Sequence, residues 1–224
     1  GPTRRSPTPV PPERVPRPGN ERGRATRVRI LEAGDRCFET HGLDMTLEQV
    51  AEVAGVTRMT VHRHTGGREQ MVTQVVLRAS ARLAAQIDAT LSRPGDPVQR
   101  LGEGLIDTVE IIRATPSLAR LFTGGDVAGP WADLDPDQRV VGAVHDFFRP
   151  HVTALAEDGR LRADLTTDEA VAWLLAQALL VLVVPSLAAT HSDLTRFFHT
   201  LAVPAVTSPL REGGPREPNR VERS

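Results

Sequence analysis

Residues 47–64 have the sequence LEQVAEVAGVTRMTVHRH, in which Ala51, Gly55 and Val61 follow the spacing Ala-x₃-Gly-x₅-Val. A helix-turn-helix packs two helices at a steep angle through a turn of three or four residues. It therefore needs a small residue where the helices cross, a residue that accepts a positive φ in the turn, and an aliphatic anchor in the second helix. Ala51, Gly55 and Val61 meet these needs in that order. The stretch predicts a helix-turn-helix, and a tight helical hairpin without any DNA contact is the alternative.

The second of these helices, from Thr57 to about His64, contains no acidic residue. Most surface helices mix the two signs of charge, whereas a helix that lies against phosphates needs an excess of positive charge. Its first turn, the end that enters the major groove in this motif, contains an arginine that can contact guanine and two residues that can contact a thymine methyl group. The side chains expected on this face are Arg58, Met59, Thr60, His62, Arg63 and His64.

The N-terminal stretch, residues 1–25, contains seven prolines and six arginines and almost no large apolar side chain. Such a composition cannot bury enough surface to offset the entropy of ordering, so it predicts a disordered basic arm. Arg24 and Arg27, where the arm meets the first helix, are expected to reach an adjacent minor groove. A solvated charge run is the alternative. The tail, residues 208–224, is expected to be disordered for the same reason.

The rest of the chain has helical periodicity and no convincing strand pattern. Start signals precede several helices: Thr46 with Gln49, Asp96 with Pro97, Asp135 with Pro136, and Thr166 with Glu169. The sequence predicts an all-α protein of about nine helices. The first helix is expected to end at Gly42. The helices after it are expected to span 46–54, 57–64, 68–91, 96–115, 135–158, 167–184 and 193–205.

Charge and composition narrow the possible functions. All 27 basic residues are arginines, which excludes chemistry that requires a lysine, and the single cysteine, Cys37, excludes an internal disulfide. Residues 1–68 carry 12 arginines against 8 acidic residues, and residues 69–210 carry 11 against 17. This division suggests a polyanion-binding module on an acidic body. No metal site is expected, because His62 and His64 lie on opposite sides of their helix. No cofactor, membrane span or catalytic motif is expected either. We expect a cytoplasmic protein that is not an enzyme.

The N-terminal residues resemble those of tetracycline-repressor-type (TetR family) regulators over about residues 26–72. In that family the first three helices bind DNA, and the other helices form a ligand pocket and a dimer interface. The resemblance implies that Thr46, Thr57, Thr60, His62 and Arg68 bind phosphates, and that Arg58, Met59 and Arg63 lie near bases. It is carried by Arg27–Ala33, Phe38, Gly42, Thr46, Val50–Ala51, Ala54–Thr57, Thr60–Val61 and His64.

The sequence departs from the family pattern after the second helix of the motif. His62 replaces the usual tyrosine, Thr65 replaces an aromatic residue, and Gly66-Gly67 replaces a proline or small-residue turn. Because these changes remove a core anchor and add backbone freedom, we expect a looser joint before the helix at residues 68–91.

Two features of the body bear on ligand binding and assembly. The helix at residues 167–184 is apolar on nearly every side, and the helix at 193–205 has an apolar stripe. They predict a homodimer built from a four-helix interface, with burial of the first helix inside one subunit as the alternative. A small-molecule pocket is expected among aromatic and polar side chains of the body, each of which could instead be ordinary core: Trp131, His145, Phe148, Trp173 and Gln177.

These observations predict four segments: an arm (1–25), a DNA-binding domain (26–67), a ligand-binding and dimerisation domain (68–207) and a tail (208–224). The function expected of them is that of a transcriptional repressor, which binds a palindromic double-stranded DNA operator as a dimer and is released by an unknown small-molecule effector. The alternative is a helical enzyme or small-molecule-binding protein whose helix-turn-helix is only structural.

Overall fold

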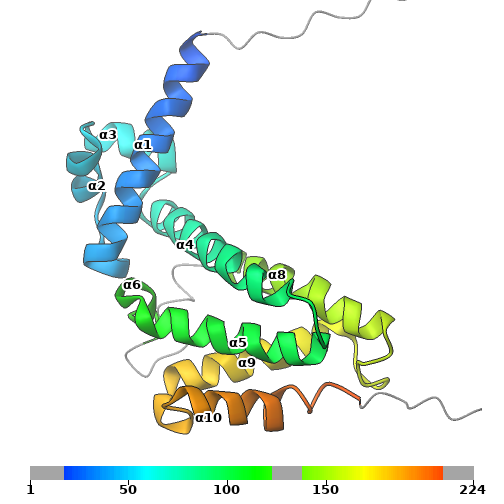
Figure 1. Ribbon diagram of the computed structural model, residues 1–224. Helices are drawn as coiled ribbons and strands as arrows, with labels where there is room; N and C mark the ends of the chain where they lie inside the picture. Colours follow the sequence, from blue (N-terminus) through cyan, green and yellow to red (C-terminus); the bar gives the residue numbers. More distant parts are fainter. Residues whose placement is uncertain (1–17, 123–137, 209–224) are drawn as a thin grey trace, which may run out of the picture.

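The structure is a computed structural model that describes residues 18–122 and 138–208 (Figure 1). Over these residues it contains nine α-helices and no strand, and a single isolated bridge joins Leu161 to Thr207. This confirms the predicted all-α class and the number of helices. None of the described helices is both long enough and apolar enough to cross a membrane.

The N-terminal part consists of three helices. Helix α1 spans Pro18–His41, a short 3₁₀ turn follows at Gly42–Asp44, and α2 spans Leu47–Ala54. Helix α3 spans Arg58–Thr65. Both α2 and α3 pack against α1 (Figure 1).

The body begins with the long helix α4, Arg68–Leu91, which packs against α1 at one end and against α5 and α8 beyond it (Figure 1). Helix α9 packs against α5 and α8, and α10 packs against α5. The remaining helices of the body are α5 (Pro97–Ala114), α6 (Pro116–Ala119), α8 (Arg139–Glu157), α9 (Thr167–Val183) and α10 (His191–Arg196), with a 3₁₀ turn at Pro185–Leu187 and a π-helix, η3, at Phe197–Ala202.

The predicted start signals form in the described residues. The Thr46 hydroxyl accepts the Gln49 backbone N–H, and the Gln49 side chain accepts the Thr46 N–H, at 3.3 and 2.8 Å. Thr166 and Glu169 form the same capping box at the start of α9. Each box satisfies backbone donors that have no partner within the helix, so these starts are encoded locally.

One contiguous core links the two parts. It includes Ile30 and Phe38 of α1, Val75 of α4, and Leu105 and Val109 of α5, all nearly inaccessible to solvent. Because α4 contributes to the packing at both ends, it joins the N-terminal helices to the body.

Three expectations about the elements are wrong. The arm is not disordered through residue 25, because α1 begins at Pro18, whose fixed φ suits the first turn of a helix. The last helix begins at His191 after Thr190, whose hydroxyl accepts the Asp193 N–H, and it continues as a π-helix instead of remaining α-helical. The helix expected from residue 135 begins at Arg139, and residues 135–137 of its start signal lie outside the described residues.

Candidate nucleic-acid interface

The turn between α2 and α3 has the geometry that the sequence predicts. Gly55 adopts the left-handed conformation, with φ 64° and ψ 41°, and its N–H donates to the Ala51 carbonyl. The Val56 N–H donates to the same carbonyl at 3.0 Å. Ala51 and Val61 are buried, with 5% and 0% of their surface exposed. Helices α2 and α3 therefore form a helix-turn-helix.

The start of α3 is capped and faces solvent. The Thr57 hydroxyl accepts the Thr60 backbone N–H at 3.2 Å and lies 2.9 Å from the Thr60 hydroxyl. Arg58 and Met59 follow in the first turn, where Met59 is 70% exposed, and this turn contains no acidic residue. A thioether with so little packing is available for contact with another molecule.

The predicted DNA-contacting residues of α3 mostly lie at the surface. Thr60 and His64 are partly buried, and the others are exposed: Thr57, Arg58, Met59, His62 and Arg63. Thr46, at the start of α2, is partly buried, and its N–H and hydroxyl are occupied by the capping box. The structure thus brings the α3 candidates onto one short helix with an accessible N-terminal end.

Arg58 has an acidic partner that the sequence analysis missed. Its Nε lies 2.5 Å from Oε1 of Glu48, in the first turn of α2, and the two side chains are 59% and 63% exposed. The pair spans the helix-turn-helix and fixes a direction for the arginine side chain. Glu48 was within the quoted stretch, but only the angle between the two helices brings it near Arg58.

Two other predicted DNA contacts hold the N-terminal helices together. Arg27 donates from Nη1 to the His64 carbonyl at the end of α3, and from Nη2 to Oε1 of Gln74 at 2.7 Å. Arg68 donates to the carbonyls of Met45 and Leu43, at 3.1 and 2.6 Å. Carbonyls at helix ends lack partners within their own helix, so both guanidinium groups satisfy acceptors that need a donor.

Arg24 lies in the N-terminal turns of α1 and is exposed. These turns project beyond α2 and α3 (Figure 1). Arg24 thus belongs to a different element from the α3 candidates.

The joint between α3 and α4 has a conformation that only glycine accepts readily. Gly66 has φ 91° and Gly67 has φ 120° with ψ −178°. The Thr65 hydroxyl donates to the Val61 carbonyl at 2.9 Å and to the Gly67 carbonyl at 3.3 Å. Gln74 donates its side-chain amide to the Thr65 carbonyl at 2.9 Å. Hydrogen bonds therefore hold this joint at the position where the family pattern has an aromatic residue.

The residues expected to form a ligand pocket lie in different environments. Phe148 is buried in the core, and His145 is partly buried, with Nε2 3.9 Å from Oδ1 of Asp168. Trp173 is 44% exposed and donates its indole N–H to the Ala202 carbonyl at 3.1 Å. Gln177 is partly buried on α9, and Trp131 lies outside the described residues. A hydrogen bond from Arg149 lowers the pKa of Asp168, which His145 also faces.

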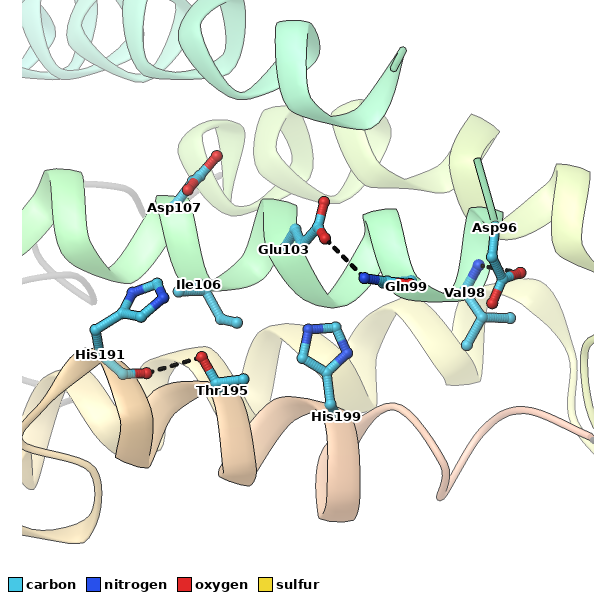
Figure 2. A pocket seen from close by; sticks show the side chains of 9 residues that line it. All are labelled: Asp96, Val98, Gln99, Glu103, Ile106, Asp107, His191, Thr195 and His199. Carbon is cyan, nitrogen blue, oxygen red and sulfur yellow. Dashed lines mark hydrogen bonds between the residues drawn. The ribbon is translucent and has the colours of Figure 1, made fainter. Parts of the chain in front are cut away.

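A cavity of about 460 Å³ lies elsewhere, between α5 and the α10–η3 segment (Figure 2). None of the four predicted ligand residues that the structure describes lines it. Gly102 allows η3 to come this close to α5, because a Cβ at that position would lie 2.7 Å from Nδ1 of His199. The residues lining the cavity are Asp96, Val98, Gln99, Glu103, Ile106, Asp107, His191, Thr195 and His199.

The carboxylates that line this cavity are engaged by neighbouring groups. Asp107 accepts the Thr90 hydroxyl at 2.5 Å, Glu103 accepts the Gln99 amide at 3.2 Å, and Asp96 pairs with Arg160 at 3.0 Å. Across residues 18–122 and 138–208, no group of three or more histidine, cysteine or acidic side chains could hold a metal ion.

The fold combines a helix-turn-helix with a capped second helix, a long connecting helix and a separate helical body. This arrangement defines the class of two-part helix-turn-helix proteins. Residues 30–75 match the family model described as bacterial regulatory proteins, tetR family. Two uncharacterized HTH-type transcriptional regulators, from two strains of Mycobacterium tuberculosis, are each 32% identical to this chain over 108 residues. The match covers 45% of this chain and 54% of each relative, so the chain spans about half the length of these relatives.

Solved structures share the fold. A putative TetR-family transcriptional regulator from Syntrophomonas wolfei has a TM-score of 0.60 at 18% identity, covering 80% of this chain and 96% of that one. SmeT, the repressor of the Stenotrophomonas maltophilia multidrug efflux pump SmeDEF, has a TM-score of 0.57 at 23% identity in its complex with triclosan, covering 82% and 92%. The chain thus contains a domain that matches the tetR family model, and its described residues share the fold of these solved structures.

Proposed function

We propose that this protein is a transcriptional regulator that binds double-stranded DNA through the first turn of α3. The observation that carries the proposal is the capped N-terminal end of α3, whose first turn contains no acidic residue and leaves Arg58 and Met59 exposed to solvent. In this motif the N-terminal residues of the second helix contact base edges in the major groove. An arginine there can bind guanine O6 and N7, and a methionine can contact a thymine methyl group.

Selection from a duplex library with random central base pairs tests DNA recognition. We expect the purified protein to enrich a palindromic sequence, and Arg58→Ala to lose about 1–3 kcal/mol of binding free energy together with its preference at one base position. Arg93→Ala, which removes an exposed arginine just after α4, is the matched control and should leave the selected sequence unchanged. Equal weakening of Arg58→Ala on every sequence would make Arg58 a phosphate contact.

The proposed regulator is a homodimer joined through α9 and the α10–η3 segment. Trp173, Leu180 and Val184 recur at spacings of seven and four on α9, and are 44%, 40% and 38% exposed. Leu201 of η3 is 60% exposed, and the Trp173 indole bonds to the neighbouring Ala202. Burying such surfaces against a second copy would form a four-helix interface. It would also pair two recognition helices, as half-sites about 34 Å apart require.

The dimer is tested by placing a charge within the apolar surface. Leu201→Asp should shift the sedimentation coefficient from that of a dimer to that of a monomer, because an unpaired carboxylate would be buried. Val28→Asp makes the same change at an exposed apolar residue of α1, 52% accessible, and should leave the dimer intact. A wild-type monomer at micromolar concentration would contradict the proposed assembly.

The regulator is further proposed to be a repressor that a small molecule releases from DNA. The solved structure of SmeT in complex with triclosan supports ligand binding by this fold. In our proposal a ligand in the body tilts α4 about the Gly66–Gly67 joint and changes the separation of the two recognition helices. A coupling of about 1–3 kcal/mol would weaken DNA binding roughly 5–150-fold.

The effector site is proposed at the five residues of the sequence analysis, and the cavity between α5 and α10 is the competing location. A compound library screened for an increased melting temperature would supply ligands. Gln177→Ala should abolish the increase if the first location is correct, whereas Gln99→Ala should abolish it if the ligand occupies the cavity. A ligand that raises the melting temperature without weakening DNA binding would contradict the proposed release.

A further inference from the structure

The ion pair between Glu48 and Arg58 has a geometry that bears on base recognition. Arg58 is the first residue of α3, and Glu48 is the second residue of α2. The closest atoms are Nε of the arginine and Oε1 of the glutamate, 2.5 Å apart. Nε is the inner nitrogen of the guanidinium group, nearest to the aliphatic part of the side chain.

A guanidinium group has distinct edges. The nearest carboxylate oxygen lies at Nε, and the two terminal nitrogens, which form the outer edge, make no hydrogen bond within the described residues, so their donors remain available. Bidentate contact with guanine needs two N–H donors of one arginine aligned with O6 and N7. The acid therefore occupies the part of the group that such a contact does not require, and it restricts rotation of the side chain.

The pair is too exposed to be explained by stability of the fold. With 59% and 63% of the two side chains accessible, solvent and salt screen the attraction strongly. A carboxylate in the first turn of α2 would also repel a nearby phosphate unless a cation neutralised it. The consequence of the pair is thus the direction of the guanidinium group and the local charge at the DNA-facing surface.

We propose that Glu48 is a positioning residue for sequence recognition: it holds the Arg58 guanidinium by its inner edge so that the outer edge is presented to a guanine. The proposal rests on the proposed DNA-binding function. It distinguishes the two arginines of α3, because the ion pairs of the described residues include none at Arg63.

The test compares variants on duplexes carrying the sequence that the full-length wild-type protein selects from a random library. Glu48→Ala should reduce the preference for guanine at one position by roughly fivefold or more, since the bidentate contact loses its alignment. Its binding to unrelated duplex DNA should stay unchanged or become tighter, because a negative charge is removed. Glu48→Gln keeps an oxygen acceptor at the same distance and should retain part of the preference.

Two controls separate positioning from a general charge effect. Glu52→Ala removes an exposed acid one turn further along α2 and should leave the base preference intact. In the Arg58→Ala background, Glu48→Ala should cause no further loss at that position, because its effect passes through the arginine. Circular dichroism and melting temperatures confirm that each variant is folded.

The possible results separate a failure of the positioning role from a failure of the proposed DNA-binding function. If the wild-type protein selects a sequence but Glu48→Ala keeps the full preference, or Glu52→Ala loses it equally, the positioning role is wrong and the DNA-binding function stands. A sharper preference in Glu48→Ala would also overturn the role, because the acid would then withhold the arginine from the base. If the wild-type protein selects no sequence, the proposed function fails and the positioning role falls with it.

Discussion

Gly34 sets how closely α1 and α4 approach each other. A Cβ at this position would lie 2.7 Å from Cγ2 of Val75, well inside van der Waals contact. Val75 is fully buried and has no room to move away. The position thus fixes the packing between the N-terminal helices and the helix that leads into the body.

We therefore expect Gly34→Ala to reduce the free energy of unfolding by about 1–3 kcal/mol, because the added methyl group overpacks the core. Urea denaturation measures the change. Gly23→Ala is the matched control on the same helix: its Cβ would have no neighbour within 4 Å, and alanine favours a helix by about 0.5–1 kcal/mol over glycine. Equal effects of the two variants would contradict the packing argument.

At the level of single residues, the sequence predicts local partners well and distant ones poorly. The caps at Thr46, Thr57 and Thr166 depend on a residue three positions away, so the pattern contains all the information. The partners of Arg27 and Arg68 lie 37 and 23 or more residues away, and only the packing of α1 against α3 and α4 brings them together. The assignment of these two arginines to DNA stays a prediction, and their bonds in this structure are internal.

Helices α1 and α4 are also joined by charge. Asp35 of α1 accepts from Arg78 and Arg82 of α4, each with a closest distance of 2.9 Å, and its side chain is 16% exposed. Two arginines one turn apart share this carboxylate, so removal of the acid would leave both without their partner in α1.

Asp35→Ala should lower the free energy of unfolding by about 1–2 kcal/mol. This loss is smaller than that for a fully buried ion pair, because the side chains of the two arginines are 40% and 50% exposed and solvent partly screens them. Raising the salt concentration should narrow the difference between the variant and wild type. Glu32→Ala, at an exposed acid one turn earlier, provides the control. A salt-independent loss of the same size in both variants would contradict the role of the ion pair.

Among the helices, the long or well-capped ones were predicted closely and the weakly encoded ones were not. Helices α2, α4 and α9 begin and end within one residue of the expected positions. The four-residue helix α6 was missed because a single turn has no measurable periodicity. The π-helix η3 was missed because its widened turn depends on packing against α5, which a local pattern does not contain.

For the molecule as a whole, one partly buried histidine makes stability depend on pH. Desolvation lowers the pKa of His151, an effect that Asp88 opposes and Arg100 reinforces. Because the folded protein favours the neutral imidazole, the unfolded chain binds more protons as the pH falls through the unfolded value of about 6.5. Its contribution to stability is thus complete above that value and is lost below it.

The free energy of unfolding should fall between pH 7.5 and pH 5.5, and His151→Gln should show a smaller fall. Urea titrations at the two pH values measure this difference. His41→Gln, which replaces an exposed histidine at the end of α1, should keep the wild-type fall. An identical pH dependence in wild type and His151→Gln would show that the His151 imidazole does not titrate differently on unfolding.

The contact between Gly102 and His199 links the interior of one subunit to its outer face. A Cβ at position 102 would lie 2.7 Å from Nδ1 of His199, so a larger residue there requires the histidine ring to turn away or η3 to shift, and a shift would move Leu201, two residues after the histidine. A shift of η3 would alter the surface that we propose for pairing with a second copy. Relatives with a larger residue at this position should therefore pair with a different geometry of the two subunits.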